Sequence, residues 1–278
     1  MKHPSWLIKK IPKSRNVRLI RNLLKDLPIH TVCESAHCPN IGECFSKRIV
    51  TFMILGNICT RNCRFCGVEK GRLRRPASID TDEPRNVALA AQKLGLKHVV
   101  ITSVTRDDLE DRGGQQFVKT IHEVKKLIPH ASVEVLIPDL DGGVQKIVEA
   151  SPKIINHNLE TVYRLYPDIR PKSDYFSSLN LLKKIKDLKK DIYTKSGFMV
   201  GLGETETEVF ELLKDLKKVN CDIVTIGQYL QPSKSQIEVK EFIPPETFER
   251  YRTTAQDLGF KQVISGPFVR SSYQLGGC

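Results

Sequence analysis

Six of the eight cysteines of this 278-residue chain fall within 34 consecutive residues, from Cys33 to Cys66. Thiols crowded in this way either form disulfides or hold metal. The basic N-terminal stretch lacks the apolar core of a secretory signal, so we expect a reducing, cytoplasmic setting in which disulfides are rare. The crowding therefore indicates metal or iron–sulfur chemistry.

The second cysteine group, Cys59, Cys63 and Cys66, has the spacing C-x3-C-x2-C, with Phe65 just before the third thiol. Three thiolates on one loop can hold three irons of a cubane, whereas usual ligation takes four. The fourth iron then stays open to chelate the amino and carboxylate groups of S-adenosylmethionine and to pass it one electron. A structural zinc site is the alternative, but zinc prefers four ligands in paired groups.

This motif at the end of a predicted first strand is similar to that of the radical S-adenosylmethionine (radical SAM) superfamily. The first group, Cys33, Cys38 and Cys44, has the spacing C-x4-C-x5-C, and this pair of triads resembles the lipoyl synthase family. Other segments also resemble that family: 51–56, 100–103, 106–109, 134–139, 157–161, 164–166, 227–233 and the Arg-Ser-Ser-Tyr motif at 270–273.

The resemblance implies two [4Fe–4S] clusters and S-adenosylmethionine as cofactors. The enzyme would be a sulfurtransferase that places sulfur at C6 and C8 of a protein-bound octanoyl group, with an auxiliary cluster as sulfur donor. The family's serine motif implies that a serine oxygen, here that of Ser272, binds the auxiliary cluster. An oxygen is a hard ligand for iron, which prefers soft donors, and such a weak bond suits a cluster that must come apart. The implied ligands are Cys59, Cys63 and Cys66 for the radical-generating cluster, and Cys33, Cys38, Cys44 and Ser272 for the auxiliary cluster.

The resemblance also implies partners. The substrate would be an octanoylated lipoyl carrier domain or the glycine-cleavage H protein. An electron donor such as flavodoxin or ferredoxin and an iron–sulfur carrier for cluster repair would be needed. The net charge of +12 fits the steering of an acidic carrier, although charge alone would fit nucleic acid equally well. We expect neither a nucleic-acid partner nor a membrane partner.

Short β-rich runs alternate with helical patterns after residue 50, which predicts an α/β fold with parallel strands. A closed eight-unit barrel needs roughly 250 residues, so we expect a partial (β/α)6 TIM-like barrel over residues 50–260. Residues 1–49, with the auxiliary triad, and the tail 261–278, with the serine motif, would cap its open face. The predicted strands are 50–55, 98–102, 132–137, 153–156, 194–200 and 222–226, and the predicted helices 84–95, 115–128, 141–150, 175–190, 205–219 and 245–258.

Chemistry in such barrels sits at the carboxyl ends of the strands. We therefore predict that Ser103, Asn158, Glu160 and Arg170 contact S-adenosylmethionine, although Glu160 and Arg170 could equally form ordinary salt bridges or helix caps. The Gly201–Glu204 segment lacks the third glycine of a dinucleotide fingerprint and predicts a tight turn.

Two further features receive structural interpretations. Asp107 and Asp108, beside Arg106, are interpreted as an ion-pair cluster at a helix entry. Cys221, just before a predicted strand, is expected to be a buried thiol.

Two other classes of function remain open. Another two-cluster radical enzyme, of the biotin synthase or methylthiotransferase type, would share the radical triad but place its extra cysteines differently. A zinc-stabilised nucleic-acid-binding protein would fit the charge, but the aromatic content is only 7% and no interleaved basic and aromatic groove is evident.

Overall fold

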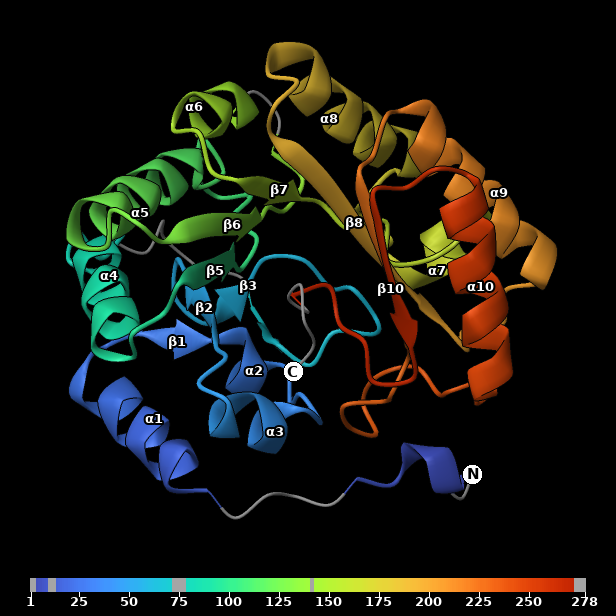
Figure 1. Cartoon of the computed structure of the whole chain (residues 1–278), viewed down its shortest axis with the longest axis horizontal. Helices are drawn as coiled ribbons and strands as arrows, with labels where there is room; N and C mark the ends of the chain where they lie inside the picture. Colours follow the sequence, from blue (N-terminus) through green and yellow to red (C-terminus); the bar gives the residue numbers. More distant parts are fainter. Residues whose placement is uncertain (1–3, 10–13, 72–78, 141–142, 273–278) are drawn as a thin grey trace. The chain divides into compact units, whose positions relative to one another are not determined.

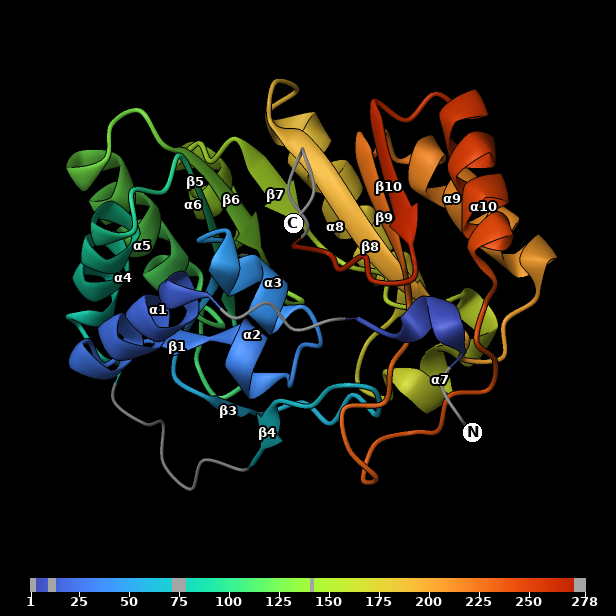
Figure 2. The same ribbon diagram turned by 60° about the horizontal axis from the view of Figure 1, so that its bottom comes forward.

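The computed structural model describes residues 4–9, 14–71, 79–140 and 143–272. The chain forms two compact units (Figures 1 and 2). We call the one built from residues 11–61 and 67–155 the N-terminal unit. The C-terminal unit comprises residues 62–66 and 156–277 together with the first ten residues, within the described parts of these ranges.

The N-terminal unit is built around strands β2 (Thr51–Ile54), β5 (His98–Ser103) and β6 (Ser132–Leu136), which pair in parallel in that order. All four residues of β2 are buried, as expected for a parallel strand covered on both faces. Helices α4 (Glu83–Lys93) and α5 (Gly114–Leu127) pack against each other and bury one apolar face each. The helix α6 (Val144–Glu149) follows β6.

Residues 14–49 add a small helical layer to the N-terminal unit. Helix α1 (Arg15–Asp26) begins at Ser14, whose side chain accepts a hydrogen bond from the Asn16 N–H at 3.2 Å. Strand β1 (His30–Thr31) pairs antiparallel with β2 and leads into α2 (Val32–Ser35) and α3 (Ile41–Ser46). The short strands β3 (Ile58–Cys59) and β4 (Glu69–Lys70) pair in parallel. Strand β7 (Ile154–Asn156) begins at the end of this unit, and its last residue, Asn156, is the first of the long C-terminal segment of the other unit.

The C-terminal unit contains parallel strands β8 (Tyr193–Val200), β9 (Ile223–Gln228) and β10 (Gln262–Gly266), in that order. Three long helices cover one face of these strands (Figure 1): α8 (Tyr175–Leu188), α9 (Glu206–Lys218) and α10 (Pro245–Asp257). The remaining helical elements of its described residues are the short 3₁₀ helices Ser5–Leu7 and Tyr163–Leu165 and the single turn α7 (Tyr166–Ile169).

Side-chain alternation separates the two faces of these strands. Phe198 and Val200 of β8 and Val224 and Ile226 of β9 pack with the helices in one hydrophobic core. Gly197 of β8 and Thr225 of β9 alternate with these core residues and therefore lie on the opposite face, which we call the inner face.

Helix ends in this unit follow from local sequence. Thr205 and Glu208 form a complete capping box at the start of α9, each side chain bonding the other residue's backbone N–H. Asp174 caps α8 by accepting a hydrogen bond from the Ser177 N–H at 2.7 Å. All six predicted strands and all six predicted helices are present, except that residues 141–142 of one helix lie outside the described residues.

Strand β10 was not predicted from the sequence. Its residues are all half-buried, and its five-residue run carries no clean alternation of apolar and polar side chains. Pairing with β9, from Gln262 opposite Ile223 to Gly266 opposite Gly227, makes it a strand. The division into segments 1–49, 50–260 and 261–278 remains a prediction.

Candidate active site

The first cysteine triad lies in the helical layer of the N-terminal unit. Cys33 is in the first turn of α2, Cys38 lies in the connection, and Cys44 is on α3. The Cys38 N–H donates to the Cys33 carbonyl at 3.0 Å, and the Ile49 N–H donates to the Cys44 carbonyl at 2.8 Å. Cys44 is buried and the other two are half-buried. These backbone hydrogen bonds therefore fix the conformation of the segment that carries the three cysteines.

Two features within the helical layer support this triad. The side chain of Asn16 on α1 donates to the Ser46 carbonyl at the end of α3 at 2.7 Å. Phe45, next to Cys44, is completely buried. The triad thus sits on a packed support.

Cys59 ends β3, and the loop that follows it is fastened to the segment after β5. The Thr105 N–H donates to the Cys59 sulfur at 3.4 Å, and the Thr60 hydroxyl donates to the Thr105 carbonyl at 3.0 Å. Hydrogen bonds to cluster sulfurs are one of the means by which proteins set cluster potential. The residues after β5 therefore contact the first thiol of the motif directly.

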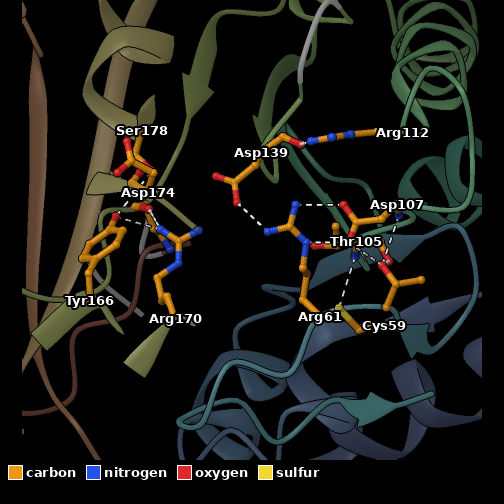
Figure 3. A network of polar contacts seen from close by, with 12 residues as sticks. Cys59, Arg61, Thr105, Asp107, Arg112, Asp139, Tyr166, Arg170, Asp174 and Ser178 are labelled. Atoms are coloured by element: carbon orange, nitrogen blue, oxygen red, sulfur yellow. Dashed lines mark hydrogen bonds and ion pairs between the residues drawn. The ribbon is translucent and has the colours of Figure 1, made fainter. Parts of the chain in front are cut away.

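Arg61 anchors the same loop through two carboxylates (Figure 3). Its Nε and Nη2 donate to the Oδ2 and Oδ1 atoms of Asp107 at 2.5 and 2.8 Å, and its Nη1 donates to Asp139 at 3.2 Å. Burial raises the pKa of Asp107, but hydrogen bonds from Arg61 and Thr60 outweigh it and hold that pKa below its ordinary value. The carboxylate is therefore ionised and available to the guanidinium at neutral pH.

The interpretation of Asp107 and Asp108 as one cluster with Arg106 needs a correction. Arg106 forms its forked ion pair with Asp108, with both contacts at 2.7 Å, as expected. Asp107 instead turns to Arg61, 46 residues earlier. Sequence reasoning missed Arg61, Asp107 and Asp139 as a group, because no local pattern connects segments this far apart.

Cys63 and Cys66 belong to the C-terminal unit. The Cys66 N–H donates to the Cys63 carbonyl at 3.3 Å, which makes a tight turn. Arg64, between them, bonds through its backbone to the Ile169 carbonyl at 2.9 Å and to the Ile237 N–H at 3.1 Å. Phe65, the aromatic residue of the motif, packs against the hydrophobic core of this unit. The turn is therefore pinned on both of its sides.

Three of the predicted S-adenosylmethionine contacts lie together in the C-terminal unit. The Asn158 side chain accepts from the Gly197 N–H at 3.0 Å and donates to Glu160 at 2.8 Å. Arg170, which is buried, donates through Nη1 to the Asn158 carbonyl at 3.0 Å and to the Tyr166 hydroxyl at 2.9 Å. Figure 3 shows the Arg170–Tyr166 contact. Asn158 thus connects Glu160 and Arg170 into one polar group.

Ser103 ends β5 in the N-terminal unit. Its hydroxyl oxygen is buried and has no hydrogen-bond partner among the described residues. In the C-terminal unit, Asn156 Oδ1 and Thr225 Oγ1 are buried and unpartnered in the same sense. Such groups are costly unless a ligand or water satisfies them. The Ser103 position therefore fits a polar ligand.

The Gly201–Glu204 segment is the tight turn that the sequence predicts. The Glu204 carboxylate accepts from the N–H groups of Gly201 at 2.5 Å and Leu202 at 2.9 Å. Both glycines have positive φ, 94° at Gly201 and 104° at Gly203. The side chain of Glu204 occupies the donors that an anion would need.

Among the described residues, no three His, Cys, Asp or Glu side chains converge on the position of a single metal ion. A cubane makes a different demand, because each thiolate binds its own iron. The donor set of each triad, three thiolates on one short segment, fits such a cluster. Ser272 is half-buried after β10, and Tyr273 of its motif lies outside the described residues.

Comparison with known proteins decides the family. A protein-family profile described as the radical SAM superfamily matches residues 53–216, more than half of the chain. The lipoyl synthase of Caldanaerobacter subterraneus subsp. tengcongensis is 58% identical over 98% of this chain and 95% of its own length. The lipoyl synthase of Caldicellulosiruptor saccharolyticus is 54% identical, with 98% and 95% covered. The chain belongs to the lipoyl synthase family of the radical SAM superfamily.

Membership confirms several expectations from the sequence. The chain is an enzyme of the radical SAM, sulfur-inserting type, and the family implies a [4Fe–4S] cluster and S-adenosylmethionine as cofactors. The α/β partial-barrel class is confirmed as well. The crystal structure of methylornithine synthase has a similar fold, with a TM-score of 0.53, 16% identity, and 90% of this chain and 82% of that chain covered.

The biotin synthase, methylthiotransferase and zinc-protein alternatives are not supported by this assignment. No helix within the described residues is both long and apolar enough to cross a membrane.

Proposed function

We propose that this chain inserts two sulfur atoms, at C6 and C8, into an octanoyl group carried on a protein lysine, to give the lipoyl cofactor. The observation that carries the proposal is the first triad. Cys33, Cys38 and Cys44 lie on the helical layer formed by residues 14–49, outside the matched superfamily region, as expected for a cluster added to the common radical SAM machinery. This layer is where the sulfur source would be held.

Cys59, Cys63 and Cys66 would hold the cluster that works with S-adenosylmethionine. When bound, this pair supplies a radical that removes hydrogen from carbons that no side chain is basic enough to deprotonate. The chain's own residues orient this chemistry. Thr105 bonds the first thiol of the loop, and Arg61 ties the loop to Asp107 and Asp139.

The ligand contacts proposed for S-adenosylmethionine are Ser103, Asn158, Glu160 and Arg170. Ser103 offers a buried hydroxyl that has no partner in the described part of the chain. Asn158 holds the Glu160 carboxylate at 2.8 Å, and Glu160 has a positive φ of 67°. A non-glycine residue in that region is uncommon, and such residues cluster at functional sites. Arg170 donates to the Asn158 carbonyl and so holds the Asn158 backbone in place.

The auxiliary cluster acts as the sulfur-donating substrate in this proposal. Its ligands would be Cys33, Cys38 and Cys44 with Ser272 as the fourth. An oxygen donor binds iron less well than a soft thiolate does, so Ser272 is the ligand from which the cluster is most readily released. Cluster loss after each turnover would require an iron–sulfur carrier for repair.

The proposed carbon substrate is an octanoylated lipoyl carrier domain or the glycine-cleavage H protein, and an electron donor such as flavodoxin or ferredoxin would reduce the cluster. Cytoplasmic location is part of the same proposal. A docking site for an acidic carrier is suggested by a surface cleft in the N-terminal unit. Arg15, Arg18 and Lys93 line it, with one acidic residue, Asp26, and the apolar Leu19 and Leu23. No acidic residue occupies the first turn of α1, so these arginines add to the positive end of the helix.

The test is iron and sulfide analysis combined with product analysis. Wild type should bind about eight iron atoms per chain, as two cubanes require, and convert an octanoylated carrier to the lipoyl form. Replacing Cys33, Cys38 and Cys44 by alanine should leave about four iron atoms, one cubane, with cleavage of S-adenosylmethionine but no sulfur insertion. Replacing Cys59, Cys63 and Cys66 should abolish both reactions. Two clusters without any thiolated or lipoyl product would refute the proposed reaction.

A further inference from the structure

The segment after β10, residues 267–272, turns back across the inner face of β8 and β9 (Figure 2). It begins with a turn in which the Val269 N–H donates to the Gly266 carbonyl at 3.0 Å, and Val269 itself is buried. We call residues 267–272 the serine tail, because it ends at Ser271 and Ser272. What holds this tail in place determines where the Ser272 hydroxyl can be.

The first contact point is Gly227 on β9. A Cβ atom added there would lie 2.2 Å from the Val269 carbonyl oxygen and 3.1 Å from its carbonyl carbon. These neighbours are backbone atoms and cannot rotate away. The tail backbone therefore lies directly on the surface of β9, at a distance that only glycine permits.

The second contact point is Gly197 on β8, which pairs with Thr225 of β9. A Cβ atom at Gly197 would lie 3.0 Å from the Cβ of Ser271 and 2.6 Å from the Thr225 hydroxyl. Two glycines on neighbouring strands thus flatten the inner face where the tail crosses it. Neither lies in the left-handed region, so close approach rather than backbone freedom requires glycine at both.

Two hydrogen bonds between the tail and its support complete the seat. The side chain of Asn156, fully buried at the end of β7, donates to the Ser271 carbonyl at 3.2 Å. Arg270 donates to the Gln228 carbonyl at 3.3 Å. The Gln228 side chain is itself held by four backbone groups of its own unit, including Val200 and Ile243. The tail therefore rests on a rigid support.

We infer that Gly197, Gly227 and Asn156 are positioning residues that seat the serine tail and so set the place of the Ser272 hydroxyl. They contact the tail backbone and Ser271, not the reacting atoms. This inference rests on the proposed role of Ser272 as a cluster ligand. A ligand on a segment without support would bind iron only at a cost in chain entropy, and a prebuilt seat removes most of that cost.

The test uses Gly227→Ala, Gly197→Ala and Asn156→Ala, with Gly266→Ala as the matched control. Gly266 pairs with Gly227 in the next strand, but a Cβ atom there would make only an ordinary contact, 3.6 Å from a Val269 methyl group. Trypsin can cut after Arg270, and intact mass reports the loss of the residues that follow. Asn156→Ala adds no atom, so it keeps the test informative where an alanine at either glycine does not fold.

Tail cleavage should be about tenfold faster in Gly227→Ala than in wild type, as expected when a close-packed contact is overfilled. Gly197→Ala and Asn156→Ala should change in the same direction, while Gly266→Ala should match wild type. In reconstituted protein the three variants should lose iron from the auxiliary cluster faster than wild type. Gly227→Ala and Asn156→Ala should retain cleavage of S-adenosylmethionine. A Cβ atom at Gly197 would also lie 3.0 Å from the Asn158 amide oxygen, so Gly197→Ala is compared only by tail cleavage and auxiliary-iron loss. Tail cleavage and auxiliary-iron loss at wild-type rates in all four variants would overturn the inference.

The two proposals fail in different ways. If wild type binds only one cluster, the proposed function fails, while the tail-cleavage comparison still reports on the seat. If wild type binds two clusters and makes product, but auxiliary iron is retained equally in seat variants and control, only the seating role is wrong.

Discussion

Arg61 and Asp107 form a two-contact ion pair, in which Nε and Nη2 of the guanidinium meet the two carboxylate oxygens at 2.5 and 2.8 Å. One partner lies inside the cysteine motif and the other lies in the segment after β5. Forked pairs of this kind give geometric specificity as well as energy. The pair therefore fixes the direction in which the loop leaves Cys59.

Arg61→Lys should weaken the loop without removing its positive charge, because lysine cannot reproduce the fork. Loss of one charge-assisted hydrogen bond costs about 1.5–3 kcal/mol. We therefore expect about tenfold or greater acceleration of iron loss to a chelator from the radical-generating cluster. The decay of cluster absorbance near 400 nm measures this rate.

Arg106→Lys is the matched control. Arg106 makes an equally forked pair, but its partner is Asp108, two residues later in the same segment, and not a residue of the cysteine loop. Arg106→Lys should lower the melting temperature but leave the rate of iron loss close to that of wild type. Equal rates of iron loss in both variants would show that the Arg61 fork has no special role in the loop.

Asp222 provides a pH-dependent contribution to stability. Lys186 and Lys261 contact its two oxygens at 2.8 and 2.9 Å, and the Thr194 N–H donates to it at 2.9 Å. Burial raises the pKa of this carboxyl, but these contacts outweigh it and hold the pKa below its ordinary value. A lowered pKa stabilises the fold above the unfolded value near 4, and this contribution is lost as pH falls through the folded value.

Asp222→Asn should therefore lower the free energy of unfolding by about 1–3 kcal/mol at pH 7. The difference from wild type should shrink below about pH 4. Urea unfolding of the iron-free proteins at several pH values measures it. Asp187→Asn, which breaks an exposed pair with Lys183, should have almost no effect. A difference that stays constant with pH would contradict the assignment to Asp222 ionisation.

Arg18→Glu should impair docking of an acidic carrier at the cleft on α1. An exposed charge contributes about 0.2–1 kcal/mol, so we expect a two- to fivefold rise in KM for the octanoylated carrier, with kcat unchanged. The rise should fade as salt is added. Lys184→Glu makes the same change in net charge on an exposed face of α8 and serves as the control. Equal KM values for the two variants would place docking elsewhere.

Cys221 should be unreactive in the folded enzyme. It is buried, and burial raises the pKa of its thiol to about 12, so almost no thiolate forms at neutral pH. Peptide mapping after iodoacetamide treatment should find Cys221 unmodified in native protein and fully modified in guanidinium. Rapid native modification would mean that this part of the fold opens.

Part of the fold was predictable from the sequence. The helices and most strands follow from apolar periodicity, which survives in any tertiary context, as in Leu179 and Leu182 of α8. Strand β10 escaped prediction because its half-buried residues owe their conformation to pairing with β9. Local pattern carries no information about such a partner.

The sequence by itself determined the family of this protein, because the spacings of its cysteine triads and its other family motifs are properties of the chain that folding does not alter. Only the tertiary structure decided which residues lie against the cysteine motif and the serine tail. Arg61 finds Asp107, and Gly227 receives Val269, across 46 and 42 residues of chain. Contacts of this kind depend on the distance between atoms in space, which strand pairing and packing set and which local sequence does not encode.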